Sequence, residues 1–173
     1  MAQNNQNNRI SVIIVDDHEV VRNGIRSYIE TVKEFQVVGE AASGEAALQL
    51  VSDYIPDIVL LDLIMPGMDG VETTRRIKQI SPRTQVVVLT SYHEDAHIFP
   101  ALKAGAISYI LKDMKMEKLV EALHRAAQKE VTLHPLVAAR VLQNIRSENG
   151  DEQPLFTELT ERELDVLRLI ANG

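Results

Sequence analysis

The chain has 173 residues, 45% of them hydrophobic, which suits one well-packed domain with an appendage and is short for two full domains. It has no cysteine, which excludes disulfides and thiolate metal sites and fits a reducing, cytoplasmic location. The formal charge of -7 at pH 7 gives no support for the basic surface that duplex DNA requires. The polar N-terminus lacks a signal-peptide core, and no apolar run approaches the ~20 residues that cross a bilayer, so we expect no membrane association.

Five short apolar runs divide the first two thirds of the chain. Several are continuous rather than alternating, which is typical of strands buried on both faces of a parallel sheet. The stretches between them keep apolar residues at helical spacing. Strand and helix therefore alternate five times, which predicts a doubly wound α/β fold with its site at the carboxyl ends of the strands. The runs are Ile10–Val15, Phe35–Val38, Ile58–Leu61, Val86–Leu89 and Tyr109–Leu111.

The pattern changes after residue 130. Pro135 suits the first position of a helix, and Val137, Val141, Leu142 and Ile145 then mark an amphipathic helix. This helix could mediate dimerisation or pack back on a neighbouring domain, and the sequence leaves both open. A last helix begins at a capping box of Thr160 and Glu163 and cannot bury its apolar face alone. We expect a disordered tail at 1–8, a first domain at 9–130, a linker at 131–154 and the start of an incomplete all-α domain at 155–173.

Acidic side chains follow two of the predicted strands. Asp16 and Asp17 come directly after the first run, and Asp62 comes directly after the third. These strand ends are neighbours in a doubly wound sheet, so we expect three carboxylates in one crevice. Unpaired anions repel one another, and oxygen ligands with room for water suit Mg²⁺, or Mn²⁺ in its place. The sequence therefore predicts a divalent-metal site.

Two further polar residues occupy the ends of later strands, Thr90 at the fourth and Lys112 after the fifth. A hydroxyl and an ammonium beside a carboxylate–metal site indicate phosphoryl transfer, in which an aspartate attacks while the metal, lysine and hydroxyl contact phosphoryl oxygens. An aspartate after a strand can also simply cap the next helix, as Asp17 could. Five such groups at consistent strand ends favour the functional interpretation. His18 follows the acidic pair, and we expect it in the first turn of a helix, pointing outward.

These residues lie within four longer motifs: VDDHEVVRNGI from Val15, PDIVLLDLIMPGMDGVE from Pro56, VVVLTSYHED from Val86 and AGAISYILKD from Ala104. Together they resemble response-regulator receiver domains over residues 10–130, and more closely the NarL/FixJ group, which carries a LuxR-type helix-turn-helix output domain. The resemblance implies a CheY-like five-stranded sheet of order 2-1-3-4-5. It also implies a signalling phosphoacceptor rather than an enzyme, limited to self-catalysed phosphoryl transfer and autodephosphorylation.

The resemblance assigns a role to each of these residues: phosphoacceptor for Asp62, metal ligand for Asp17, Asp62 and the backbone carbonyl of Ile64, metal contact through water for Asp16, phosphoryl contact for Lys112 and Thr90, and conformational switch for Thr90 and Tyr109. A loop shaped by Pro66, Gly67 and Gly70 follows the acceptor. The implied phosphodonor is a sensor histidine kinase, and the implied response is homodimerisation that controls DNA binding.

The tail LTERELDVLRLIANG from Leu159 resembles the opening helix of the LuxR-type output domain. The helices that would enter the major groove do not follow it, so we expect specific DNA binding of the intact protein but not of this chain. The segment SYIETVKEFQVVGEA from Ser27 is similar to envelope-stress regulators of the LiaR/VraR type.

The sequence departs from the family pattern at a few positions, and it also leaves alternative functions open. Asp113 stands after the lysine where many receivers have proline, and the bulky Ile64 and Tyr92 are expected to hinder water and slow loss of the phosphoryl group. The segment from His93 to His97 matches H-E-x-x-H, which in a helix can bind zinc. A stand-alone receiver acting as a phosphorelay carrier is a second alternative. A phosphohydrolase would carry another aspartate where Ile64 stands.

Overall fold

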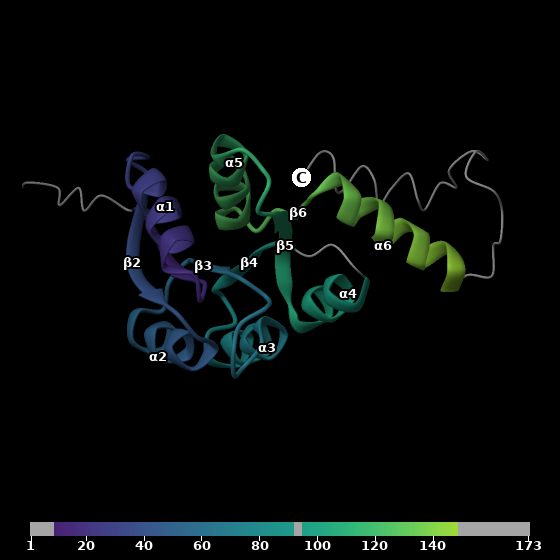
Figure 1. Ribbon diagram of the computed structural model, residues 1–173, viewed down its shortest axis with the longest axis horizontal. Helices are drawn as coiled ribbons and strands as arrows, with labels where there is room; N and C mark the ends of the chain where they lie inside the picture. The colour runs from purple at the N-terminus through teal and green to yellow at the C-terminus, as the bar shows by residue number, and fades with distance from the viewer. Residues whose placement is uncertain (1–8, 92–94, 149–173) are drawn as a thin grey trace, which may run out of the picture.

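The computed structural model of the protein describes residues 9–91 and 95–148, and Figure 1 shows strands alternating with helices along this part of the chain. The elements in chain order are β1 (Ile10–Val15), α1 (Glu19–Ile29), β2 (Phe35–Ala41), α2 (Gly44–Tyr54), β3 (Ile58–Leu61), α3 (Gly70–Ile80), β4 (Gln85–Thr90), α4 (Asp95–Ala104), β5 (Ala106–Leu111), α5 (Met116–Ala127), β6 (Thr132–Leu133) and α6 (Pro135–Glu148).

The strands form one parallel sheet in the order β2-β1-β3-β4-β5-β6, with α1 and α5 on one face and α2, α3 and α4 on the other (Figure 1). The continuous apolar runs are explained by this layering, because successive side chains of a strand point to opposite faces. Ile14 and Leu60 pack in the cluster beneath α1 and α5, whereas Val15 and Leu61 pack in the cluster beneath α2 and α3. The predicted doubly wound fold is confirmed.

The sheet has six strands where the sequence predicted five. The order of the first five is the predicted one, and β6 adds to the edge through the pairs Ser108↔Thr132 and Tyr109↔Leu133. The pairing is extended by the backbone N–H of His134, which donates to the carbonyl of Tyr109 at 2.9 Å. A strand of two residues has no periodicity that a sequence pattern could reveal.

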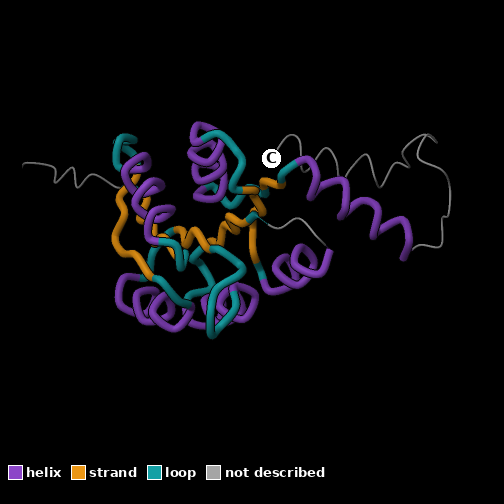
Figure 2. Tube along the Cα trace, in the orientation of Figure 1, coloured by secondary structure: helices purple, strands orange, loops and turns teal. Residues whose placement is uncertain are grey.

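Helix α6 begins at Pro135, as predicted, and runs away from the β6 edge of the sheet (Figure 2). Its first two turns pack back on the sheet, because Val137 is fully buried and Val141 partly buried in a cluster with Ile98 of α4 and Tyr109 of β5. Of the two possibilities that the sequence left open, packing on the neighbouring domain is therefore observed. The capping box at Thr160 lies outside the described residues.

The helices of the described part are all too short or too polar to cross a bilayer.

Candidate functional site

Three carboxylates meet at the carboxyl edge of the sheet. Asp16 and Asp17 follow β1, Asp62 follows β3, and the two strands are direct neighbours in which Val15 pairs with Leu61. The ladder continues for one residue beyond the strands, because the N–H of Asp62 donates to the carbonyl of Val15 at 2.9 Å. Oxygen atoms of the three carboxylates and a ring nitrogen of His18 lie within 4.8 Å of one another. The predicted convergence is confirmed.

Lys112 joins two of these carboxylates. Its Nζ lies 2.6 Å from Oδ2 of Asp16 and 2.6 Å from Oδ2 of Asp62. Both aspartates are buried, with exposed fractions of 3% and 5%. Burial of the ammonium lowers the pKa of Lys112, but its hydrogen bonds to Asp16 and Asp62 outweigh this effect and raise the pKa above the ordinary value. The lysine is therefore held as a cation between two buried anions.

Thr90 lies beside this group on β4, and the N–H of Lys112 donates to its carbonyl at 2.9 Å. The Thr90 hydroxyl is buried and has no hydrogen-bond partner among the described residues. Because a buried polar atom without a partner is costly, it marks a position where a ligand oxygen would be stabilised.

The acidic group fits a hard divalent cation. Oδ1 of Asp17 is buried and accepts no hydrogen bond of good geometry within the described residues, although Nδ1 of His18 lies 2.9 Å away. Clustered carboxylate oxygens, one of them left without a hydrogen bond, form the donor set that Mg²⁺ prefers. A cation bound there would offset the negative charge that Lys112 alone does not neutralise.

His18 is closer to the site than the sequence suggested. It precedes α1 as the N-cap residue instead of lying in its first turn. Its side chain is 66% exposed, in agreement with the prediction, but its Nδ1 also lies 3.1 Å from Oδ1 of Asp16. The carbonyl of Asp16 in turn accepts a hydrogen bond of 2.6 Å from Arg22 of α1. Arg22 lies within the motif that begins at Val15, but the sequence alone gave it no role at the site.

The loop after Asp62 requires glycine at its end. A Cβ on Gly70 would lie 2.5 Å from the carbonyl oxygen of Asp62, whereas real Cβ atoms stay beyond 3.0 Å from such neighbours. The backbone of this loop also takes a positive φ of 80° at Gly67. Oε1 of Glu45, at the start of α2, accepts a hydrogen bond from the N–H of Met68 at 3.2 Å. Nothing in the sequence marks Glu45 as a support of this loop, because it lies 23 residues before Met68.

Ile64 and Tyr109 occupy contrasting environments. Ile64 is 39% exposed beside the acidic group, and its N–H lies 3.4 Å from Oδ1 of Asp62. Tyr109 is fully buried in the cluster that also contains Val137. Tyr92, the other bulky residue expected near the acceptor, lies outside the described residues.

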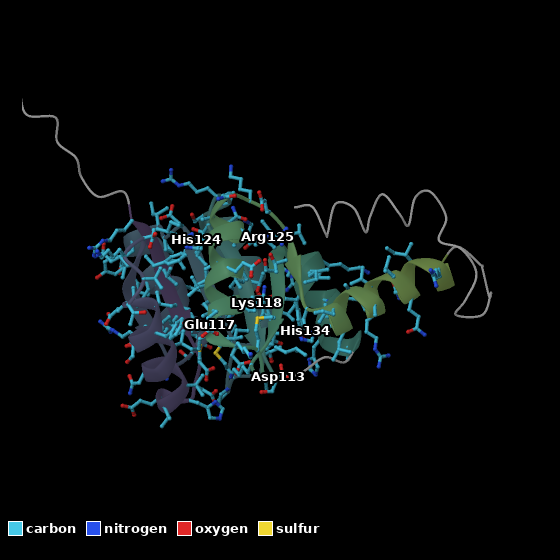
Figure 3. The ribbon with its side chains drawn as sticks, turned by 90° about the horizontal axis from the view of Figure 1, so that it is seen from above. Asp113, Glu117, Lys118, His124, Arg125 and His134 are labelled. Atoms are coloured by element: carbon cyan, nitrogen blue, oxygen red, sulfur yellow. The ribbon has the colours of Figure 1, made fainter. Side chains whose placement is uncertain are left out.

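The possible zinc motif gains no support from the described residues. His93 and Glu94 lie outside them, and His97 lies in α4 away from the metal-ligand group found around Asp16. Zinc would need a third ligand, but the ring of His124 packs against Phe35, with centroids 4.6 Å apart. Figure 3 shows His124 and Glu117 at opposite ends of α5.

Comparison with known proteins places these features in one family. The profile of the response regulator receiver domain matches residues 12–124. The transcriptional regulatory protein LiaR of Bacillus subtilis is 38% identical over 95% of this chain and 77% of that protein. The response regulator protein VraR of Staphylococcus aureus is 42% identical over the same shares, 95% and 77%. A LuxR-family two-component response regulator from Aurantimonas has a similar structure, with a TM-score of 0.73 and 33% identity over 83% of this chain and 99% of that one.

Proposed function

The chain belongs to the response regulator receiver family, and on that premise we propose that Asp62 accepts a phosphoryl group and thereby switches the protein between two states. The observation that carries this proposal is the buried Asp62 carboxylate held 2.6 Å from the Lys112 ammonium, with an unpartnered Thr90 hydroxyl on the adjoining strand. A nucleophile, a cation and a free donor are the groups that phosphoryl transfer needs.

In the proposed reaction a carboxylate oxygen of Asp62 attacks the phosphorus of the donor. The new O–P bond forms as the bond to the donor breaks, and the donor's leaving group departs with that electron pair. The Lys112 ammonium moves from pairing with a carboxylate oxygen to neutralising a phosphoryl oxygen. The Thr90 hydroxyl, which has no partner among the described residues, donates to another.

The same group suits Mg²⁺, for which we propose Asp17, Asp62 and the backbone carbonyl of Ile64 as ligands, with Asp16 acting through water. When bound, the cation supplies charge neutralisation for the phosphoryl oxygens. The protein's own part is to hold the ligands in place. The Arg22 guanidinium fixes the Asp16 carbonyl, and Gly70 lets α3 approach the backbone of Asp62.

We propose Thr90 and Tyr109 as the switch pair. Phosphorylation adds roughly two negative charges, which would draw the Thr90 hydroxyl toward the phosphoryl group. Tyr109 lies in the next strand and is buried against α4 and α6. Movement at Thr90 would therefore favour one of two packings of this cluster rather than create a new state.

LiaR is a transcriptional regulatory protein, and we propose the same role here. A sensor histidine kinase would be the phosphodonor, and a phosphorylated homodimer would control a DNA-binding domain that begins in residues 155–173. In this division of the chain, residues 9–130 form the receiver and residues 131–154 the linker.

The proposal is tested by the intact mass of the protein after incubation with acetyl phosphate and Mg²⁺. We expect one added phosphoryl group, absent in Asp62→Asn and after chelation of the metal. Asp57→Asn is the matched control, because Asp57 precedes β3 at the opposite end of the strand and should leave the adduct intact. An adduct that persists in Asp62→Asn, or none in the folded wild type, would contradict the proposal.

A further inference from the structure

The sheet has a second polar region at its amino edge. The starts of β1, β3 and β4 and the ends of α2 and α5 surround a cavity of about 650 Å³. Pockets for small ligands typically measure about 300–1,000 Å³. The strands are parallel, so this cavity lies at the opposite end from the acidic group, about 20 Å away for a strand of six residues. It takes no part in the proposed phosphorylation. Its lining residues are Arg9, Ile10, Ser11, Ile55, Pro56, Asp57, Arg83, Gln85, Ala127 and Lys129.

The lining contains three cations, Arg9, Arg83 and Lys129, and one carboxylate, Asp57. None of the three cations forms an ion pair with a carboxylate in the described part of the chain. Asp57 offsets only one of these three charges, and its Oδ2 is oriented toward Ser11, from whose N–H and hydroxyl it accepts hydrogen bonds at 2.8 and 2.7 Å. The cavity is therefore positively charged within a chain whose formal charge is -7.

The pKa of Lys78 is lowered by burial and in part by the positive charge of Lys129, one of the cations that line the cavity. The Lys78 ammonium donates to the carbonyl oxygens of Pro82 and Thr84, at 2.7 and 2.8 Å, and not to a carboxylate. The repulsion between these lysines is thus left without a compensating anion in the described residues.

The backbone at the cavity is also unusual. Among the described residues, only Ile55 and Lys129 combine a side chain with a positive φ, 45° and 63°, and both line the cavity. Each follows the end of a helix, where glycine is favoured because it takes this conformation without strain. A β-branched residue is especially rare there. The chain thus places an apolar and a cationic side chain at two cavity positions whose backbone glycine would adopt without strain.

We propose that this cavity binds a small organic phosphate. The guanidinium groups of Arg9 and Arg83 and the ammonium of Lys129 would hold its phosphate oxygens, since guanidinium and phosphate pair in a bidentate manner. The apolar part of the ligand would rest on Ile55 and Pro56, which form part of the same lining. The proposal is independent of phosphorylation at Asp62.

The direct test is a ¹H–¹⁵N NMR titration of the unphosphorylated chain with pyrophosphate and with ATP, in buffer without divalent metal. We expect saturable shifts at the amides of Ser11, Asp57, Gln85 and Lys129 with both probes, and tighter binding of ATP because its base can contact the apolar lining. Shifts that do not saturate, or that centre on Asp62, would overturn the proposal. Equal affinity for the two probes would overturn the assignment of an apolar subsite.

Variants distinguish a site from general charge attraction. Lys129→Gly and Arg83→Gln should each lower the affinity on the order of tenfold, the usual effect of losing one charged hydrogen bond. Lys115→Gln removes another cation without an ion pair, at the start of α5 on the opposite edge, and should leave affinity within about twofold. An equal loss in Lys115→Gln would show that the probes respond to the general charge of the chain and not to the cavity, and would overturn the proposal.

Discussion

The two edges of the sheet differ in how their charged side chains are paired. At the carboxyl edge, Asp16 and Asp62 are buried and share the Lys112 ammonium at 2.6 Å. At the amino edge, Arg83 and Lys129 face a cavity without any ion pair in the described part of the chain. Strands of one sheet therefore end at a site where a lysine pairs with two buried carboxylates, and begin at a cavity whose cations have no ion pair in the described residues.

This difference has a physical consequence for stability. Removing one partner of a buried pair leaves an uncompensated charge, which is costly, whereas removing an exposed and unpaired cation changes little. For the binding of an anion the unpaired cations have the advantage, because they can attract it without first breaking an ion pair. Substitutions at the carboxyl edge should therefore mainly lower the stability of the protein, and substitutions at the amino edge should mainly lower its affinity for a ligand.

The largest expected effect is that of Lys112→Met. Without divalent metal, Asp16 and Asp62 would lie buried without their cation, and we expect the free energy of unfolding to fall by about 3 kcal/mol. Added Mg²⁺ should restore part of the loss, since a bound cation replaces the missing charge. Urea denaturation with and without Mg²⁺ measures both effects.

Lys129→Met is the matched change at the amino edge and should alter the free energy of unfolding by less than about 0.5 kcal/mol. Equal losses in Lys112→Met and Lys129→Met would show that the pairing of charge does not distinguish the two edges.

A smaller effect is expected from Gly70→Ala, because its Cβ would lie 2.5 Å from the backbone of Asp62 and Leu63. Forcing this backbone apart should destabilise the protein by about 2 kcal/mol and displace the acceptor loop. Gly24→Ala on α1 is the control, since a Cβ there meets nothing within 4 Å. Because alanine favours the helix over glycine, this change should raise the free energy of unfolding by about 1 kcal/mol. The midpoints of thermal denaturation of the two variants should therefore shift in opposite directions.

How much the sequence could predict also differs between the two edges. The bounds of β1 and β3 were predicted correctly because their apolar runs end abruptly at acidic residues. Asp16, Asp17 and Asp62 follow those strands directly, so a topology rule was enough to bring them together. Their roles in catalysis and metal binding remain predictions.

The amino edge carried no comparable signal. Its cavity is lined from several separate segments, and an arginine such as Arg83 resembles any exposed loop arginine in sequence. The left-handed backbone of Ile55 was equally hidden, because isoleucine is not a residue that a pattern places there. β6 was missed for a related reason, because its two residues, Thr132 and Leu133, are too few to show a period. The partner of Val137 also stayed open, because helical spacing shows which face of a helix is apolar but not what covers that face.

Ser11→Ala tests whether the single carboxylate of the amino edge is held by structure. The Ser11 hydroxyl donates to Asp57 at 2.7 Å and accepts from its N–H at 2.9 Å, so its loss should cost about 1 kcal/mol. Ser27→Ala on α1 is the control, because that exposed hydroxyl bonds only the carbonyl of Asn23 in its own helix. If the Ser11 variant is as stable as the Ser27 variant, the hydrogen bonds of Ser11 do not hold the Asp57 carboxylate in place, and it could turn toward the cations of the cavity.

The smallest expected effect, that of Ile55→Gly, is an increase in the free energy of unfolding. Ile55→Gly relieves a positive φ of 45°, and we expect the free energy of unfolding to rise by about 0.5 kcal/mol, the strain relieved exceeding the added chain entropy. Ile80→Gly is the control, because Ile80 is 46% exposed against 47% for Ile55 but has the ordinary backbone of α3, where glycine costs about 1 kcal/mol. Chemical denaturation resolves the difference between the two variants. A loss of stability in both would mean that the contacts of Ile55 outweigh its strain, and the isoleucine would then need no ligand to explain it.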